Sequence, residues 1–176
     1  MNLYKENLII FTILLTISLP VSSSYAGGTV VALGASNTYG YGVSRSESYP
    51  AQLQKLLRSK GVRANVLNKG ISGHSTEQML KRLSSAVPKG TRLVILQPGG
   101  NDYRQGYTGT QRAANIREIT QRLKKRRIKV MIMRNSLLRK VGRRPGNAAL
   151  DRIHLTPKGY KELAREILPQ VVKYVR

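Results

Sequence analysis

The sequence predicts an α/β fold, a three-layer α/β/α sandwich built on a mostly parallel sheet of four or five strands. Short apolar runs typical of buried strands alternate along the chain with longer segments whose apolar residues recur at helical spacing. The alternation is regular from the first strand to the last helix. Because parallel strands need long crossover connections, usually helices, this order favours a parallel sheet covered on both faces.

The predicted elements follow one another as strand, helix, strand, helix. The strands are predicted at 29–33, 62–67, 92–96 and 128–133. The helices are predicted at 49–60, 75–85, 111–127 and 157–175. The last helix has a clear start, because the Thr156 hydroxyl can cap it and Pro157 suits its first turn. The longest loop-like stretch, 141–149, lies just before that helix.

Residues 1–26 have the pattern of a signal peptide. Lys5 precedes an apolar run at 8–19, and small residues lead up to Ala26. The run is shorter than the ~20 residues that a membrane-spanning helix needs. We expect cleavage after Ala26, export to the periplasm or out of the cell, and one mature domain over 27–176. A domain of that size can bury a core without disulfides.

The composition excludes several kinds of site. The chain has no cysteine, so disulfides, a lipid anchor on cysteine and thiolate metal sites are ruled out. Only two histidines and eight acidic residues are present. A set of potential ligands this small predicts no metal centre, and nothing in the sequence calls for another cofactor.

The formal net charge is +23, with 31 Lys and Arg against eight Asp and Glu. A charge of this size informs about partners rather than about the fold. It favours contact with an anionic membrane or polysaccharide surface, and a generally basic proteome is the alternative explanation. The chain has no recognised nucleic-acid-binding motif, so we expect no specific nucleic-acid partner. We expect a monomer.

Polar, glycine-rich segments follow the predicted strands, where folds of this class place their chemistry. These segments are 34–42, 68–75 and 99–102, and a fourth, 151–154, precedes the last helix. Together they contain a serine, a histidine, an aspartate and several amide donors. A hydroxyl nucleophile needs a base, a group that orients the base, and donors for an oxyanion. Each segment alone is a weak signal, but the set supplies all four roles.

In this order, the four segments resemble the conserved blocks of SGNH (GDSL-like) hydrolases, which have a flavodoxin-like fold. The resemblance is strongest to small periplasmic members of the lysophospholipase, thioesterase and arylesterase type, and it spans nearly the whole mature chain. The matching positions are Gly34, Ser36, Thr38, Gly40 and Gly42, then Ser72, Gly73 and Ser75, then Gly99, Asn101 and Asp102, and finally Asp151 and His154.

The resemblance implies a role for each residue of the site. Ser36 is the catalytic nucleophile, His154 is the base that takes its proton, and Asp151 orients and stabilises the imidazole. The oxyanion hole consists of the backbone N–H groups of Ser36 and Gly73 and the side-chain amide of Asn101. No metal or other cofactor takes part.

Three further residues in or beside these blocks each have two alternative interpretations. His74 and Tyr103 are candidates for substrate binding, with a surface histidine and a packing tyrosine as the alternatives. Asp102 either caps the helix that follows it or fixes the loop that carries Asn101.

The sequence departs from the family pattern at two places. Ala35 stands where the family usually has aspartate, so we expect a missing hydrogen bond and a looser turn. The segment 133–151 leaves little room for the additional helix and strand that the family commonly has there. We therefore expect a minimal version of the fold, with less support for the loop of Asp151 and His154.

The resemblance implies an exported serine hydrolase that cleaves small or lipid acyl esters, including thioesters, through an acyl-serine intermediate. A polysaccharide or peptidoglycan O-deacetylase of the same fold is the alternative within this class. A basic binding module without turnover is the alternative from another class, motivated by Ala35 and the short segment before Asp151.

Overall fold

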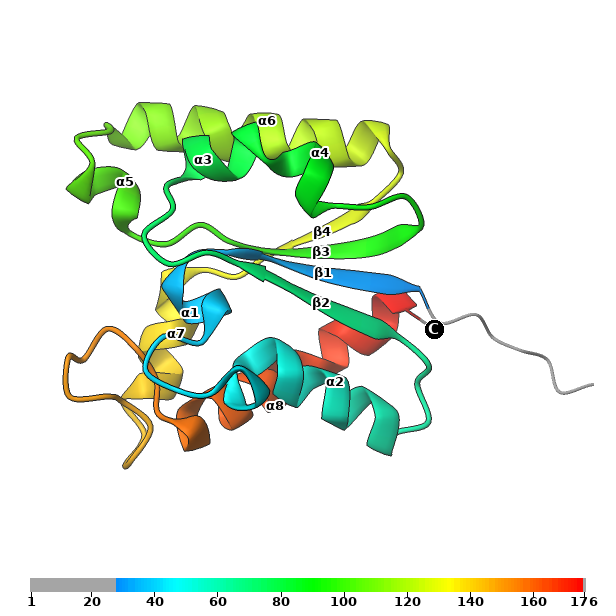
Figure 1. Cartoon of the computed structure of the whole chain (residues 1–176), viewed down its shortest axis with the longest axis vertical. Helices are drawn as coiled ribbons and strands as arrows, with labels where there is room; N and C mark the ends of the chain where they lie inside the picture. Colours follow the sequence, from blue (N-terminus) through cyan, green and yellow to red (C-terminus); the bar gives the residue numbers. More distant parts are fainter. Residues whose placement is uncertain (1–27, 176) are drawn as a thin grey trace, which may run out of the picture.

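Four parallel strands form the central sheet of the computed structural model, which describes residues 28–175 (Figure 1). The strands are β1 (Thr29–Gly34), β2 (Asn65–Gly70), β3 (Thr91–Gln97) and β4 (Lys129–Ile132). Their order is β2-β1-β3-β4, and every neighbouring pair is parallel. This is the flavodoxin-like order without its fifth strand, so the predicted fold class is confirmed. The predicted signal peptide and its cleavage point lie outside the described residues.

Helices cover both faces of the sheet (Figure 1). One face carries α1 (Ser36–Tyr39), α2 (Tyr49–Ser59), α7 (Asn135–Gly142) and α8 (Pro157–Val175), with the short 3-10 helix η1 (Arg45–Glu47) nearby. The other carries α3 (Thr76–Lys81), α4 (Leu83–Ala86), α5 (Asn101–Arg104) and α6 (Gly109–Lys125). No helix among residues 28–175 has the length and hydropathy to cross a membrane.

Successive residues of each strand enter two different cores, because side chains alternate between the faces of a sheet. In β1, Val30 and Ala32 pack with α2 and α8, whereas Val31 and Leu33 pack with α3, α4 and α6. All four are fully buried. A strand buried on both faces has the continuous apolar sequence from which it was predicted.

The second predicted strand and the second predicted helix differ from the structure. The second strand begins at Asn65 rather than 62, because the Val62 N–H bonds back to the Leu57 carbonyl at the end of α2, at 2.9 Å. Val62 is apolar because it is buried in the core beside α2. The helix predicted at 75–85 is divided at Arg82 into α3 and α4.

The segment between β4 and α8 differs most from expectation. It holds a two-turn helix, α7, in a stretch where the sequence indicated little room for one. It does not hold a fifth strand. In its place Ala148 and Leu155 form an isolated antiparallel bridge, so the chain folds back on itself just before α8.

Candidate active site

Ser36 lies at the turn where β1 ends and α1 begins, at the carboxyl edge of the sheet. Gln97, the last residue of the neighbouring β3, holds this turn. Its side-chain oxygen accepts hydrogen bonds from the Ala35 N–H at 3.3 Å and from the Thr38 hydroxyl at 3.2 Å. Ala35 is buried. The turn is therefore bonded to β3 although position 35 has no acidic side chain.

α1 is pressed against β2, and a glycine makes this possible. A Cβ atom on Gly70 would lie 2.2 Å from the backbone nitrogen of Tyr39. Only a residue without a side chain can occupy that position while α1 stays in place. Gly70 thus allows α1, which begins at Ser36, to lie close against β2.

His154 connects Ser36 to Asp151. Its Nε2 atom lies 2.8 Å from the Ser36 Oγ atom, and its Nδ1 atom lies 2.5 Å from Oδ2 of Asp151. The Tyr41 ring packs against the imidazole, with 4.6 Å between ring centroids. The structure therefore brings the predicted nucleophile, base and orienting carboxylate into one chain of hydrogen bonds.

Asp151 is held in its ionised form by hydrogen bonds. The bond to the His154 side chain is the largest cause, followed by the backbone N–H groups of His154 and Ile153, each donating to Oδ1 at 2.9 Å. These contacts lower the pKa of Asp151 to about 2. The carboxylate side chain is 41% exposed, so hydrogen bonding and not burial controls its charge.

The folded-back segment before α8 seats the loop that carries Asp151 and His154. The Ala149 N–H donates to the His154 carbonyl, and the Thr156 N–H to the Asn147 carbonyl, each at 2.9 Å. The Asn147 side chain is fully buried. Its amide donates to the Val141 carbonyl at 3.0 Å and to Glu162 of α8 at 2.8 Å. These bonds support the loop without a fifth strand.

Asn37 joins α1 to the loop that carries His154. It is buried, and its amide donates to the Ile153 carbonyl at 3.3 Å. The Tyr160 hydroxyl of α8 donates to the Asn37 side-chain oxygen, also at 3.3 Å. Burial raises the pKa of Tyr160, which keeps this hydroxyl protonated as a donor. This contact could not be predicted from the sequence, because an asparagine in a turn has many possible partners.

Three N–H donors lie on the loops around Ser36. The backbone N–H groups of Ser36 and Gly73 donate to no other described residue. One N–H of the Asn101 amide donates to the His74 carbonyl at 3.0 Å, and its second N–H has no partner among the described residues. Gly73 has φ of 81°, a left-handed conformation that favours glycine. Its own carbonyl accepts from Gln105 at 2.8 Å.

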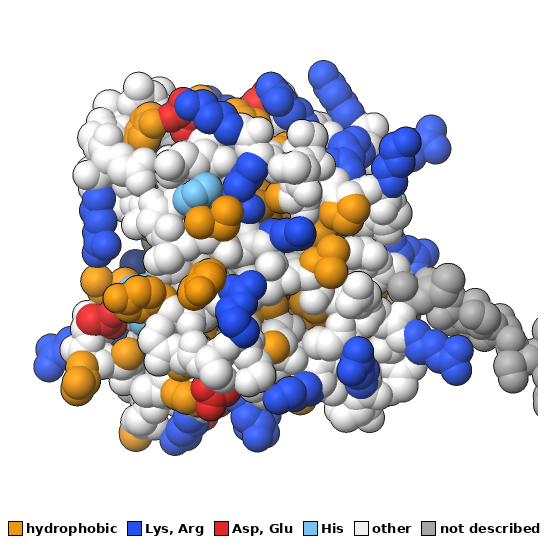
Figure 2. Space-filling view, viewed as in Figure 1, with side chains coloured by type: hydrophobic (Ala, Val, Ile, Leu, Met, Phe, Trp, Pro, Cys, Tyr) orange, Lys and Arg blue, Asp and Glu red, His pale blue; other side chains and the backbone are white. Residues whose placement is uncertain are grey.

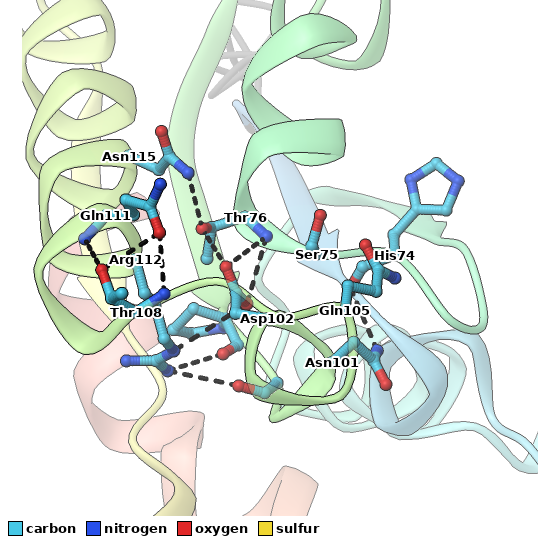
Figure 3. A network of polar contacts seen from close by, with 12 residues as sticks. His74, Ser75, Thr76, Asn101, Asp102, Gln105, Thr108, Gln111, Arg112 and Asn115 are labelled. Atoms are coloured by element: carbon cyan, nitrogen blue, oxygen red, sulfur yellow. Dashed lines mark hydrogen bonds and ion pairs between the residues drawn. The ribbon is translucent and has the colours of Figure 1, made fainter.

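Asp102 fixes the loop of Gly73 to the loop of Asn101, as Figure 3 shows. Its buried carboxylate accepts hydrogen bonds from the N–H group and the hydroxyl of Thr76. Arg112 of α6 lies 3.9 Å from the same carboxylate and donates to the Pro98 carbonyl at 2.6 Å. Of the two predictions for Asp102, the loop-fixing one agrees with these contacts.

His74 and Tyr103 are not brought to the site in the same way. The His74 ring points away from Asn101 and Asp102 (Figure 3), and its Nδ1 atom accepts a hydrogen bond from Arg82 at 3.3 Å. Burial, and then the Arg82 charge, lower the pKa of His74. Tyr103 is 61% exposed. Neither residue is part of the lining of the cavity beside Ser36.

That cavity has a volume of about 570 Å³. Ser36, Asn101 and His154 lie in its wall. The remaining walls come from the ends of β3 and α5, from α7 and from the loop before α8. Sequence reasoning missed the contribution of α7, although Leu137, Leu138 and Val141 have the spacing of a helix face. Among residues 28–175 no cluster of three or more His, Asp or Glu side chains could hold a metal ion.

A hydroxyl, an imidazole and a carboxylate joined by hydrogen bonds, beside unpaired N–H donors, form the arrangement found in serine hydrolases. Here it lies at the carboxyl edge of a parallel sheet, with the serine near the start of the described chain and the aspartate and histidine together near its end.

Known proteins place this arrangement in a family. The model of the GDSL-like lipase/acylhydrolase family matches residues 32–166. Thioesterase 1/protease 1/lysophospholipase L1 of Escherichia coli is 32% identical over 170 residues, covering 96% of this chain and 76% of that protein. The chain belongs to the GDSL-like lipase/acylhydrolase family, and it is an ester-hydrolysing enzyme.

Solved structures agree with this assignment. AlinE4, an SGNH-hydrolase family esterase, is 28% identical with a TM-score of 0.62, over 85% of this chain and 97% of that one. The crystal structure of TesA has a TM-score of 0.74 at 22% identity, over 83% and 99% of the two chains, and shows the common fold. The resemblance found in the sequence is confirmed.

Proposed function

We propose that this protein is an exported serine hydrolase that cleaves carboxylic acyl esters, thioesters included, through an acyl-serine intermediate. The observation that carries the proposal is the continuous contact of Ser36, His154 and Asp151, with distances of 2.8 and 2.5 Å. The same contact argues against a binding module without turnover, because such a module has no need to hold these three side chains in hydrogen-bond contact.

In the acylation step, the Ser36 Oγ atom attacks the acyl carbon while His154 Nε2 takes the hydroxyl proton. The carbonyl oxygen becomes an oxyanion, which the N–H groups of Ser36, Gly73 and Asn101 stabilise. The bond to the alcohol or thiol then breaks, and His154 returns the proton to that leaving group. Asp151 stabilises the imidazolium throughout.

In the deacylation step, water attacks the acyl-serine bond and His154 takes the proton of the water. The second oxyanion forms in the same place. When it collapses, the carboxylic acid leaves and Ser36 recovers its proton from His154. No other cofactor is needed, because every proton moves between Ser36, His154, water and the substrate.

Export is the second part of the proposal. The apolar run at 8–19 and the small residues up to Ala26 support it. Expression of the full chain in a bacterium with a Sec pathway would give a mature protein that begins at Gly27 outside the cytoplasm. Intact mass measurement of the purified protein checks this, and an unprocessed chain would contradict it.

Release of p-nitrophenol from acetate and octanoate esters tests the hydrolytic mechanism. We expect the Ser36→Ala variant of residues 27–176 to lose at least about 10³-fold in kcat. The Ser84→Ala variant, on the exposed side of α4, serves as the matched control and should keep its activity. A rate that survives in Ser36→Ala would contradict the mechanism.

The ratio of the two ester rates bears on the substrate. Preference for octanoate supports an esterase of longer acyl chains, whereas turnover of acetate alone points to an O-deacetylase. No turnover of either ester by folded protein would favour the binding module.

A further inference from the structure

We propose, on the basis of the proposed function, that the substrate of this site is an anionic ester, one that carries a carboxylate or a phosphate group near the scissile bond. The observation behind it is that four arginine side chains line the cavity next to Ser36 and His154. They are Arg104, Arg139, Arg143 and Arg152.

These arginines reach the cavity from three separate parts of the chain. Arg104 ends α5, Arg139 lies on α7, Arg143 directly follows that helix, and Arg152 lies between Asp151 and His154. None of the four guanidinium groups forms a hydrogen bond or ion pair with another residue in 28–175. No acidic side chain belongs to the described lining of the cavity. The positive charge beside the nucleophile is therefore unneutralised.

The charges of α7 are divided between its two sides. Lys140 and Arg144 turn to the acids of α8, with nitrogen–oxygen distances of 3.5 and 3.1 Å. Arg139 and Arg143, each one residue earlier, turn to the cavity and have no acid there. Residues four apart share a helix face. α7 and the two residues after it therefore carry one pair of basic side chains that contacts acids and one pair that does not. The paired acids are Glu166 and Glu162.

Other arginines near the site already serve the fold. Arg82 donates to the Gly34 carbonyl at 3.1 Å, and Arg112 donates to the carbonyls of Pro98 and Gly99 at 2.6 and 3.3 Å. Their guanidinium groups hold main-chain turns. The four cavity arginines have no such partner among the described residues, so a structural role does not account for them.

Guanidinium groups bind carboxylates and phosphates through paired hydrogen bonds. The same cavity has apolar walls from Leu138, Ile153 and Leu155. A substrate that matches both features has an apolar part and an anionic group attached to one ester bond. The anionic group can belong to the acyl part or to the alcohol part.

Two matched pairs of esters distinguish an anionic group on the acyl part from one on the alcohol part. The first pair is mono-4-nitrophenyl adipate and 4-nitrophenyl hexanoate, which share chain length and leaving group and differ by a carboxylate on the acyl side. The second pair is 4-acetoxyphenyl phosphate and its dimethyl ester, which differ in charge on the alcohol side. We expect kcat/KM to be about tenfold higher for the anionic member of at least one pair, mainly through a lower KM.

The double variant Arg139→Gln/Arg143→Gln tests the cavity directly. We expect it to lose about tenfold in kcat/KM on the preferred anionic ester, because two exposed ion pairs are lost. On the neutral ester it should stay within about twofold. The matched control, Arg134→Gln/Lys140→Gln, removes the same charge from the same segment but outside the cavity lining, and it should keep the anionic preference. Added NaCl should reduce the preference in the wild-type protein.

The outcomes separate this inference from the proposed function. Neutral esters that are hydrolysed through Ser36 without an anionic preference in either pair would overturn the inference alone. An anionic preference reduced equally in the cavity variant and in the control would also overturn it, because net charge would then explain the effect. No turnover of any ester would overturn the proposed function and this inference with it.

Discussion

At the scale of single residues, the charge of Asp151 is the most informative feature of the site. Three hydrogen bonds lower its pKa to about 2, and burial opposes this only weakly because the side chain is 41% exposed. One carboxylate oxygen faces the imidazole, and the other accepts two backbone N–H groups of the same loop. The residue thus has two separable functions, one electrostatic and one in the shape of the loop.

The Asp151→Asn variant separates these functions. Its side-chain oxygen can still accept the backbone N–H groups of Ile153 and His154, so we expect little change in thermal stability. The new amide donates to Nδ1 and places the imidazole proton on Nε2, which can then no longer accept the Ser36 proton. We expect kcat to fall about 10²–10⁴-fold. Steady-state kinetics and a thermal melt check this, and a melting point lowered in proportion to activity would contradict it.

The low pKa of Asp151 also predicts how the stability and the activity depend on pH. Because the folded-state pKa of about 2 lies below the ordinary value, the carboxylate contributes to stability above its ordinary range. This contribution is lost as the pH falls toward about 2. We therefore expect Asp151 to stay ionised between pH 8 and 5 and to take up no proton in that interval. A pH profile of kcat/KM checks this, and a loss between pH 8 and 5 that the Asp151→Asn variant does not show would contradict it.

The sequence predicts which residues of the candidate site lie together better than it predicts their supporting contacts. The proximity of Ser36, Asp151 and His154 could be predicted because the chemistry restricts their types and the segments have a fixed order. Gln97 and Asn37 could not, because each acts through a contact with a residue far along the chain. An amide side chain after a strand or in a turn has many possible uses, and only the folded geometry selects one.

At the scale of secondary-structure elements, apolar spacing predicts what packs on the sheet. β1, β3, α2 and α8 were found within a residue or two because they bury long apolar faces. α7 was missed because it has only two turns and many charges around Leu137, Leu138 and Val141. Its stability comes from tertiary contacts, among them the ion pair of Lys140 with Glu166 of α8.

The contacts of Asn147, which hold the loop before α8 in place, lead to a prediction at this scale. In the Asn147→Ala variant, the buried Val141 carbonyl loses a partner and Glu162 loses one of its donors. We expect a loss of about 1–3 kcal/mol in stability, together with lower kcat because the loop of His154 is less well held. The Asn65→Ala variant, at an exposed position of β2, is the control. Unchanged melting and unchanged kcat in Asn147→Ala would show that the loop is seated by other contacts.

At the scale of the whole molecule, positive charge is spread over the surface while the acids are locally engaged. Lys and Arg side chains are distributed over the whole face in Figure 2, with few acidic ones between them. Each acid among the described residues has a hydrogen-bond or ion-pair partner, as the contacts of Glu47, Glu77, Asp102, Glu118, Asp151, Glu162 and Glu166 show. The Lys and Arg side chains that give the net charge of +23 therefore repel one another across the surface.

Salt should stabilise this protein by screening that repulsion. The Debye length falls from about 30 Å at 0.01 M to about 8 Å at 0.15 M ionic strength. We expect the Tm to rise over this range by at least the ~2–4 °C that corresponds to about 1 kcal/mol in a domain of this size. The double variant Arg63→Glu/Lys89→Glu reverses two exposed charges far from the cavity, so it should melt higher at low salt and respond less to NaCl. A Tm that is flat or falls with NaCl would mean that local ion pairs, which salt weakens, outweigh the repulsion of the whole charge.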